Sequence, residues 1–384
     1  MSLERGLVGC ERDRARVMLD RAARAGFRAL GRVEPGVMVG CVLVTRTGEV
    51  VVAHHERFGA PHAEANALAL CRARGIDASG AEVFVTLEPC AHTGKTPPCA
   101  DALIEAGVGK VVCARRDPNR VASGGAERLR SAGIDTCFTD ASANAVALSD
   151  AFVKRVTTGL PWVVVKWAQT LDGKLAARSG HSQWVSNDRS RRAVHRLRGR
   201  IDAVLTGIGT VKADDPMLTA RGVTVRRVAR RGVIDEGLEL PTDCALVRSS
   251  GESPVTVVTT AESVGDQAGG ARAEALRALG VEVLEAPSCL GGLVDLRAAL
   301  AMLVDRHQIA NLMVEAGSGL VSAFLEAQLA DELLVYVAPK LLGDSEAMSA
   351  VTGRCAERMD EAVQLSLRSL RKMGDDLELR YQLG

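Results

Sequence analysis

One histidine, one glutamate and two cysteines in the N-terminal third have the types and spacing of a catalytic metal site. They lie in the segments Pro61-His62-Ala63-Glu64, Leu87-Glu88-Pro89-Cys90 and Thr96-Pro97-Pro98-Cys99. One histidine and two cysteines give zinc three protein ligands and leave its fourth position to water. Bound zinc lowers the pKa of that water and supplies hydroxide near neutral pH. The carboxyl group of Glu64 has the chemistry to take a proton from water and pass it to a leaving group.

This pattern is similar to the signature of zinc deaminases, His-x-Glu followed by Pro-Cys-x-x-Cys, with the second part stretched. We expect His62 and Glu64 in the first turn of a helix opened by Pro61. Cys99 opens another helix, whose dipole favours a thiolate, and Cys90 follows a strand. Two alternatives remain: a closed structural zinc site with His92 as fourth ligand, and cysteines that merely pack in a core.

Two glycine-containing turns in the C-terminal half predict a second kind of chemistry. Gly317-Ser318-Gly319 lies between a predicted strand and a predicted helix, and Gly207-Ile208-Gly209-Thr210 follows another strand. Backbone amides in such turns can approach a phosphate, so the pair predicts a dinucleotide lying across the edge of a sheet. Each turn alone is also compatible with a purely structural role.

A few charged residues near these turns are candidate ligands. Arg198 and Arg221 could pair with a sugar phosphate, or form salt bridges and solvated surface. Asp214 opens Asp-Asp-Pro, a sequence that often caps a helix N-terminus. His181 and His195 have no evident partner, and we expect both to be structural.

The elements that must position these residues alternate between strand and helix in both halves. In the first half the pattern predicts strands over 37–45, 49–54, 82–86, 110–115 and 134–138, and helices over 11–30, 62–74, 98–106, 126–132 and 140–156. In the second it predicts strands over 162–167, 203–206, 255–259, 281–284, 311–315 and 332–337, two more within 361–383, and helices over 187–197, 271–279, 293–305 and 320–327. Residues 219–250 are weakly patterned and predict loops or edge strands. Gly159-Leu160-Pro161 punctuates the chain, so we expect two α/β domains, 1–158 and 159–384.

Composition narrows the class of protein. Lys plus Arg number 48 and Asp plus Glu 47 among 384 residues, and aromatic residues are 3%. This balance gives no electrostatic or stacking reason to expect nucleic-acid or membrane-surface binding. No apolar run reaches the ~18 residues of a membrane helix, and the charged start Met1-Ser2-Leu3-Glu4-Arg5 is no secretion signal. Ten scattered cysteines do not form a secreted disulfide framework. We therefore expect a cytoplasmic enzyme.

The stretch from Val85 to Asp101, with its His-Thr-Gly-Lys-Thr-Pro-Pro-Cys insertion, resembles the bifunctional riboflavin-biosynthesis deaminase/reductase family. The resemblance implies that His62, Cys90 and Cys99 bind zinc and that Glu64 is the proton donor and acceptor. The chain departs from the family pattern at two segments. Pro35-Gly36-Val37 stands for Pro-Asn-Pro, and Asp117-Pro118-Asn119-Arg120 for Asp-Pro-Asn-Pro, so altered substrate recognition is expected in this half.

The resemblance continues through the second half, in segments 165–174, 180–186, 202–221 and 312–320. It implies a dihydrofolate-reductase-like α/β fold that uses NADPH, beside a cytidine-deaminase-like three-layer α/β/α domain. The residues it assigns to the nucleotide are Ala168, Trp184, Thr210, Asp214, Gly317, Ser318 and Gly319. Those it assigns to the substrate are Ser182, Arg198, Leu218, Arg221 and Glu315. Asp214 is a proton donor or a nucleotide contact. The family's Glu-Gly-Gly is Glu315-Ala316-Gly317 here.

The resulting expectation is an enzyme with two successive activities. The first half deaminates 2,5-diamino-6-ribosylamino-4(3H)-pyrimidinone 5′-phosphate, and the second reduces the ribosyl side chain to ribityl with NADPH. The partner is then a small pyrimidine ribose phosphate rather than nucleic acid or membrane, and a homo-oligomer is compatible with the sequence. One alternative is a reductase whose N-terminal half is a zinc-binding scaffold with impaired deamination. Another is a different zinc deaminase, acting on nucleosides or tRNA.

Overall fold

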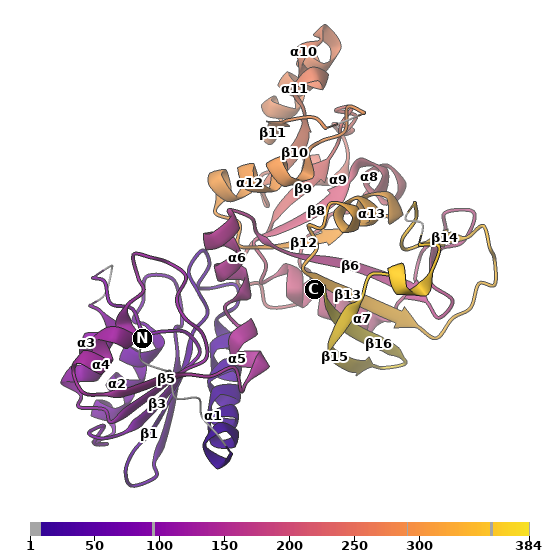
Figure 1. Cartoon of the computed structure of the whole chain (residues 1–384). Helices are drawn as coiled ribbons and strands as arrows, with labels where there is room; N and C mark the ends of the chain where they lie inside the picture. The colour runs from indigo at the N-terminus through magenta and orange to yellow at the C-terminus, as the bar shows by residue number, and fades with distance from the viewer. Residues whose placement is uncertain (1–8, 94–96, 290, 354–355, 384) are drawn as a thin grey trace. The chain divides into compact units, whose positions relative to one another are not determined.

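Two β-sheets organise the chain, one on each side of Gly159 (Figure 1). The computed structural model describes residues 9–93, 97–289, 291–353 and 356–383. The motif residues Gly94, Lys95 and Thr96 lie outside the described residues. Within the described part of the chain, no helix has the length and apolar character needed to cross a bilayer.

The first unit is built on a five-stranded sheet with the strand order β2-β1-β3-β4-β5. Its strands are β1 (Gly40–Val44), β2 (Val50–His54), β3 (Glu82–Val85), β4 (Lys110–Cys113) and β5 (Asp135–Phe138). β1 pairs antiparallel with both β2 and β3, whereas β3, β4 and β5 run parallel. Every residue of β1 is buried, as the continuous apolar run Gly-Cys-Val-Leu-Val requires of a central strand covered on both faces.

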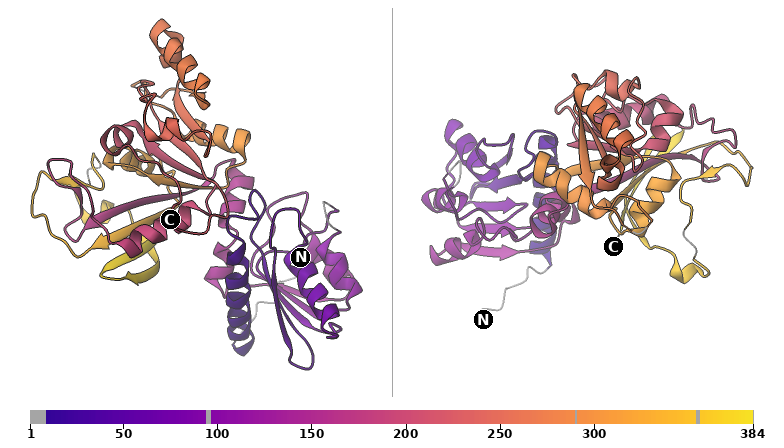
Figure 2. Two further views of the ribbon diagram at one scale, coloured as in Figure 1. Left: turned by 180° about the vertical axis from the view of Figure 1, so that it is seen from behind. Right: turned by 90° about the horizontal axis from the view of Figure 1, so that it is seen from above.

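Helices cover both faces of this sheet and make the three-layer α/β/α arrangement expected from the sequence (Figures 1 and 2). They are α1 (Cys10–Gly26), α2 (Ala63–Ala73), α3 (Cys99–Glu105), α4 (Gly125–Ser131), α5 (Ala143–Ala147) and α6 (Asp150–Thr158). On one face Leu19 of α1 packs with Val42 and Phe84. On the other, Leu68 of α2 and Leu103 of α3 pack with Leu43 and its neighbours.

The expected single helix over 140–156 is wrong, because the structure contains two helices separated at Leu148 and Ser149. The Ser149 hydroxyl donates to the carbonyl of Val146 at 3.2 Å, and the Ser149 backbone leaves the helical region at ψ 3°. A serine that bonds to nearby backbone competes with helix propagation. The hydroxyl of Ser142 accepts from the N–H of Ala145 and caps the short α5.

The second unit is built on a nine-stranded sheet with the order β11-β10-β9-β8-β12-β6-β13-β16-β15. Its strands are β6 (Trp162–Thr170), β8 (Ala203–Gly207), β9 (Arg230–Ile234), β10 (Val255–Thr260), β11 (Val281–Ala286), β12 (Asn311–Glu315), β13 (Glu332–Ala338), β15 (Leu365–Met373) and β16 (Asp376–Leu383). The first seven strands in this order, from β11 to β13, are all parallel. β16 and β15 add an antiparallel hairpin at one edge. β7 (Lys174–Ala176) and β14 (Met348–Ser349) form a separate two-stranded ribbon.

Two apolar cores lie on the two faces of the larger sheet. Its helices are α7 (Asp188–Arg198), α8 (Ile208–Asp214), α9 (Ala245–Arg248), α10 (Ala261–Gly265), α11 (Gln267–Ala278), α12 (Leu296–His307) and α13 (Ser318–Glu326). Leu300 of α12 and Phe324 of α13 pack in one core. Val194 of α7, Leu246 of α9 and Leu276 of α11 pack in the other.

The expectation that 219–250 holds only loops or edge strands is also wrong, because β9 lies inside the sheet between β8 and β10. The strand is hidden in the sequence by a buried arginine. Arg231 is fully buried, and its guanidinium donates to the carbonyls of Met217 and Ser249 and to the hydroxyl of Ser249. These bonds replace the water that the charge loses on burial, so a cationic residue occupies a position where sequence patterns predict an apolar one.

Candidate active sites of the two units

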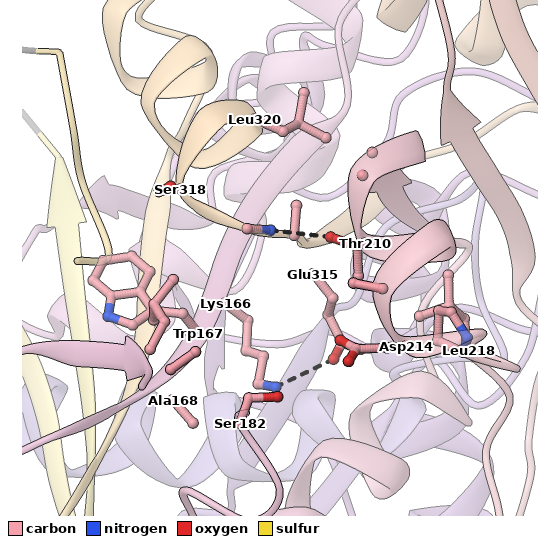
Figure 3. Close-up of a pocket in the computed structure, with 18 of the residues that line it drawn as sticks. Lys166, Trp167, Ala168, Ser182, Thr210, Asp214, Leu218, Glu315, Ser318 and Leu320 are labelled. Carbon is pink, nitrogen blue, oxygen red and sulfur yellow. Dashed lines mark hydrogen bonds and ion pairs between the residues drawn. The ribbon is translucent and has the colours of Figure 1, made fainter. Parts of the chain in front are cut away.

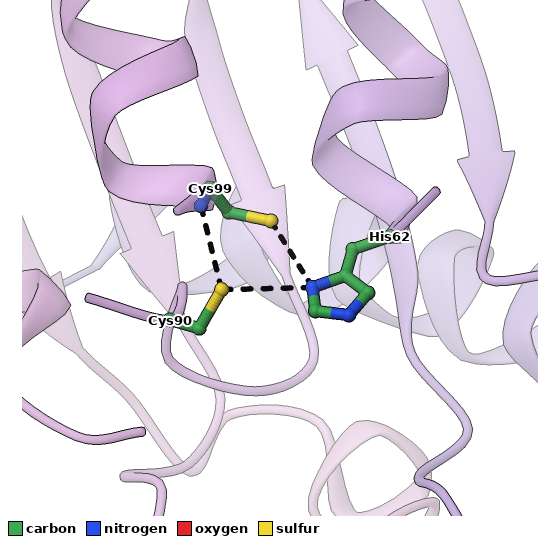
Figure 4. A group of neighbouring side chains, drawn as sticks. All are labelled: His62, Cys90 and Cys99. Carbon is green, nitrogen blue, oxygen red and sulfur yellow. Dashed lines mark hydrogen bonds between the residues drawn. The ribbon is translucent and has the colours of Figure 1, made fainter. Parts of the chain in front are cut away.

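The predicted metal ligands of the first unit come together at one end of its sheet (Figure 4). His62 Nδ1 lies 3.6 Å from Cys90 Sγ and 3.3 Å from Cys99 Sγ, and all three donor atoms lie within 4.8 Å of one another. Ligands of one tetrahedral zinc ion at standard bond lengths lie roughly 3.5 Å apart. The donor set therefore fits zinc. Among the residues that the structure describes, no fourth histidine, cysteine or carboxylate joins this group, and His92 is not part of it.

The three donors lie on three separate segments of the chain, each near the end of a helix or strand. His62 is the N-cap residue of α2, with φ −70° and ψ 169°, rather than a residue of its first turn, and Pro61 precedes the cap. Cys99 is the first residue of α3, as expected, and its backbone N–H lies 3.4 Å from Cys90 Sγ. Cys90 follows β3 in the chain. Because the donors belong to separate elements, their distances depend on the packing of the whole unit.

The ionisation of the two thiols favours metal binding. The hydrogen bond with Cys99, and then that with His62, lower the pKa of Cys90 to about 4. The bond with Cys90, burial and the nearby Glu64 raise the pKa of Cys99. The hydrogen bond with Cys90 also raises the pKa of His62. The lowered pKa of Cys90 favours its thiolate, and binding of a divalent cation would displace the proton of Cys99.

Glu64 lies on α2, next to the donor group. Its side chain is only 3% exposed, and burial raises its pKa to about 7. The carboxyl also interacts with the Cys99 thiol. A carboxyl group whose pKa lies near neutrality can both accept and release a proton at the same pH.

The sequence did not identify two residues, His55 and Glu88, that contact the segments carrying the metal donors. Buried His55 lies edge-on to the His62 ring at 5.3 Å between centroids, and its Nδ1 lies 3.0 Å from the carbonyl of Pro61. Buried Glu88 accepts from the N–H groups of Asp117, Gly124 and Ala126 and so fixes the segment that follows β4. The sequence signal for Glu88 was its place beside Pro89-Cys90.

Gly36 stands where the family pattern has asparagine, and the structure leaves little space for a side chain there. A Cβ atom at Gly36 would lie 2.8 Å from the carbonyl oxygen of Val33 and 3.3 Å from the Phe58 ring. An asparagine there would require the neighbouring residues to move. The local backbone is therefore adapted to glycine.

A cavity of about 1160 Å³ opens in the second unit, at the carboxyl ends of β9, β8, β12 and β6 (Figure 3). In parallel α/β sheets this edge is where ligands bind. Every residue that the resemblance assigned to the nucleotide or substrate lines it: Ala168, Ser182, Trp184, Arg198, Thr210, Asp214, Leu218, Arg221, Glu315, Gly317, Ser318 and Gly319.

A buried ion-pair cluster forms one wall of the cavity. Arg198 donates from Nε to Glu315 Oε1 at 2.6 Å and from Nη2 to Oε2 at 2.9 Å, and its Nη1 donates to the carbonyl of Thr219. Lys166, which sequence reasoning did not single out, lies with its Nζ 3.2 Å from Glu315 Oε2 (Figure 3). Burial opposes ionisation of Glu315, but Arg198 and Lys166 outweigh it and lower its pKa to about 2.

Two further cationic or titratable groups adjoin this cluster. Arg221 lines the cavity with an exposed side chain, and its backbone N–H lies 3.3 Å from His195 Nδ1. His195, expected to be structural, also lines the cavity. Burial, then the charges of Arg198 and Arg221, lower the pKa of His195. Arg198 and Arg221 thus concentrate positive charge on this wall of the cavity, which favours binding of an anion.

The two glycine-containing turns differ from each other. Gly317 caps the nine-residue helix α13, and its N–H donates to Thr210 Oγ1 at 3.2 Å. Apart from its chain neighbours and the backbone of α13, no atom lies within 4 Å of where a Cβ of Gly319 would be, so a ligand can approach the backbone there. Gly207-Ile208-Gly209-Thr210 is not a loop but the N-cap and first turn of α8. Asp214 ends α8, so its interpretation as a helix N-cap is wrong.

Two of the predicted contacts have special surroundings. Leu218 is only 3% exposed and packs in the core, with a positive φ of 54°. Trp184 is 60% exposed, and the Arg191 guanidinium carbon lies 4.5 Å from its ring centroid. The tryptophan is thus a stacking surface at the mouth of the cavity.

Comparisons with known proteins cover both units. Residues 14–115 match the cytidine and deoxycytidylate deaminase zinc-binding region, and residues 161–379 match the RibD C-terminal domain. The chain is 39% identical over 361 residues to riboflavin biosynthesis protein RibD of Escherichia coli K12, covering 93% of this chain and 96% of that protein. It is 37% identical to the protein of the same name from Actinobacillus pleuropneumoniae, covering 94% and 93%.

Solved structures give the same result. Acinetobacter baumannii RibD has a TM-score of 0.79 at 34% identity, covering 97% of this chain and 100% of that one. A diaminohydroxyphosphoribosylaminopyrimidine deaminase/5-amino-6-(5-phosphoribosylamino)uracil reductase from Thermotoga maritima has a TM-score of 0.80 at 30% identity, covering 97% and 99%. The similarity therefore extends over both units rather than one.

Proposed function

This chain belongs to the RibD family of bifunctional riboflavin-biosynthesis deaminase/reductases, and from that premise we propose how its own residues divide the two reactions. The protein acts on a pyrimidine phosphate, with a zinc-binding deaminase region and a reductase domain whose kind implies a nicotinamide cofactor. We assign deamination to residues 1–158 and reduction to residues 159–384.

In the first unit His62, Cys90 and Cys99 would hold zinc. Zinc, when bound, supplies hydroxide at neutral pH for attack on the ring carbon that bears the 2-amino group. Glu64 takes the proton released from water and delivers it to the departing amino group, which leaves as ammonia. The buried position of Glu64 beside the donor group and its pKa of about 7 support this role.

In the second unit we assign the substrate phosphate to Arg221 and Arg198, with Ser182 and the backbone at Leu218 beside it. Glu315 holds Arg198 and Lys166 in place. A carboxylate kept ionised by two cations cannot act as the acid. Because the Arg198 guanidinium is already bound by Glu315 and Thr219, the bidentate contact with a phosphate dianion is assigned to Arg221, and Arg198 adds positive charge beside it.

Reduction replaces the bond between ribose C1′ and its ring oxygen by a bond to hydride, and the released oxygen takes a proton. The hydride comes from the dihydronicotinamide, which we place against Trp167 and Ala168 on β6; the resemblance names NADPH as its source. The Lys166 side chain ends in the cavity (Figure 3), and we assign its ammonium group as the donor of this proton. Asp214, exposed on the rim at the end of α8, then serves as a contact for the nucleotide, together with Thr210, Trp184, Gly317, Ser318 and Gly319.

The observation that carries this proposal is a complete donor set beside a buried glutamate in one unit and a cation-lined cavity in the other. The test is the variant Glu64→Gln in the zinc-loaded full chain. We expect loss of ammonia release from the diaminopyrimidine phosphate, with unchanged dinucleotide oxidation on substrate that is already deaminated. Retained ammonia release would show that the assignment of Glu64 is wrong.

A further inference from the structure

The cavity of the second unit carries its cations at one end and a carboxylate at the other. Glu236 lies just after β9 and lines the cavity, far along the strand order from the cluster of Lys166, Arg198 and Glu315. We propose that Glu236 makes this site select a nicotinamide dinucleotide that lacks a 2′-phosphate, NADH over NADPH. The inference rests on the proposed reductase function.

The strand order fixes where Glu236 lies relative to the reacting groups. Along the carboxyl edge the order is β9, β8, β12 and β6, and these strands contribute Glu236, Gly207, Glu315 and Lys166 to the cavity. Neighbouring strands lie about 4.8 Å apart, so β9 and β6 are separated by roughly 14 Å. That is a length that a dinucleotide bound across the strands can span.

The polarity of the bound dinucleotide follows from the two ends. The hydride must reach the substrate, so the nicotinamide lies at the β6 end, near Lys166. The pyrophosphate lies near the N-terminus of α13, where Gly319 leaves the backbone open. The adenosine half is then directed to β9. Ile234, Glu236 and Leu293 line this end, two apolar side chains for the adenine and one carboxylate for its ribose.

Glu236 is held in place but not neutralised. Its carbonyl oxygen accepts from Thr259 Oγ1 at 3.1 Å and from Ser263 Oγ, which fixes the backbone. Among the described residues, no lysine, arginine or histidine forms an ion pair with its carboxylate. Lys212, the basic residue of the neighbouring helix α8, forms its ion pair with Glu239 and not with Glu236.

A half-buried carboxylate at this position discriminates between the two dinucleotides. It accepts hydrogen bonds from the 2′-hydroxyl and 3′-hydroxyl of an unmodified adenosine ribose, as acidic residues after a strand do in NAD sites. A 2′-phosphate would instead bring a second negative charge against it, and none of the described residues that line this end is a cation. The resemblance implies NADPH for the family, and this carboxylate points to the opposite preference in this chain.

The test is direct binding to the full chain, without turnover. Dissociation constants for NADH and NADPH are measured by nicotinamide fluorescence, and adenosine 5′-monophosphate and adenosine 2′,5′-bisphosphate are compared as competitors. We expect NADH to bind at least tenfold more tightly than NADPH. Glu236→Gln and Glu236→Ser should each reduce that ratio at least fivefold, mainly by improving NADPH binding.

Glu252→Gln is the matched control. It removes the same charge from an exposed position before β10, at the amino edge of the sheet, and should leave the ratio unchanged. The inference is overturned if the wild-type chain binds NADPH more tightly, or if both Glu236 variants keep the wild-type ratio. Failure to bind either dinucleotide would instead overturn the reductase function on which the inference rests.

Discussion

At the scale of single residues, the proposed reduction depends most on Lys166. It is the ammonium group in the ion-pair cluster, and its partner Glu315 already shares both oxygens with Arg198. The pattern of the sequence gave no reason to select a lysine in an apolar strand. The structure selects it because its side chain leaves the strand and ends in the cavity.

Lys166→Met should lower kcat for reduction by about 100-fold or more, the usual contribution of a positioned proton donor. The dissociation constant for the dinucleotide should change much less than kcat, since our proposal places the pyrophosphate and adenosine away from Lys166. Rapid mixing with deaminated substrate and fluorescence titration give the two readouts. Lys212→Met, at an exposed pair with Glu239, is the control, and an unchanged kcat in Lys166→Met would contradict the assignment.

The same cluster predicts a pH dependence of stability. Burial raises the pKa of Glu315, but Arg198 and Lys166 lower it to about 2, whereas in the unfolded chain it lies near 4.3. A depressed pKa contributes stability that is complete above the unfolded value and is lost as pH falls through the folded value. The stability gap between wild type and Glu315→Gln in urea unfolding should therefore shrink from pH 5 to pH 3. A constant gap would show that the carboxylate is not held ionised.

Residues that carry chemistry were largely predictable, but their mutual contacts were not. The three metal donors follow from a motif in the sequence, whereas the residues that line the cavity were assigned through the family resemblance. Arg198 and Glu315, however, were expected as separate substrate contacts, and the structure pairs them with each other. They lie 117 positions apart in sequence, so only the fold brings them together. In our proposal Glu315 therefore positions Arg198 and Lys166 rather than contacting the substrate alone.

At the scale of elements, the position of the metal-binding residue Cys90 depends on a close backbone contact between α4 and the loop before Cys90. The chain at Gly125, where α4 begins, passes so near Pro89 that a Cβ there would lie 1.7 Å from the Pro89 carbonyl oxygen. Pro89 precedes the ligand Cys90, so α4 packs directly against the metal-binding loop. Glu88 reinforces this contact by accepting from Ala126 N–H at 3.0 Å.

Gly125→Ala should destabilise the first unit by about 1–3 kcal/mol, the cost of forcing an extra carbon into a packed site. The displacement passes to Cys90, so zinc content should fall as well. Thermal unfolding and metal analysis measure the two effects. Gly251→Ala, at a position with open space and no positive φ, is the control, and full zinc content in Gly125→Ala would contradict the proposed coupling.

Long apolar segments were predicted well, and elements that depend on tertiary contacts were not. β1, β12 and β13 read directly from their apolar runs. β9 was missed because Arg231 satisfies its buried charge through Met217, Ser249 and Ser253, residues distant in sequence. Gly207-Ile208-Gly209-Thr210 was expected as a glycine-containing turn after a strand, yet α8 begins there at Ile208.

At the scale of the whole molecule, the two units have separate apolar cores, and each contains its own candidate site. Removal of zinc should therefore act on one activity only. A chelator should abolish ammonia release and lower the unfolding temperature of the first unit, while dinucleotide oxidation on deaminated substrate persists. Zinc addition should restore ammonia release. Loss of both activities on chelation would show that the units do not function separately.

The central claim is that one chain performs deamination and then reduction. The most direct test supplies the zinc-loaded full chain with the diaminopyrimidine phosphate and reduced dinucleotide and follows ammonia and dinucleotide oxidation together. The account predicts that ammonia appears first and that ammonia and oxidised dinucleotide reach a ratio of about one to one, because each substrate molecule loses one amino group and then accepts one hydride. Dinucleotide oxidation without ammonia, or ammonia without any oxidation, would contradict it.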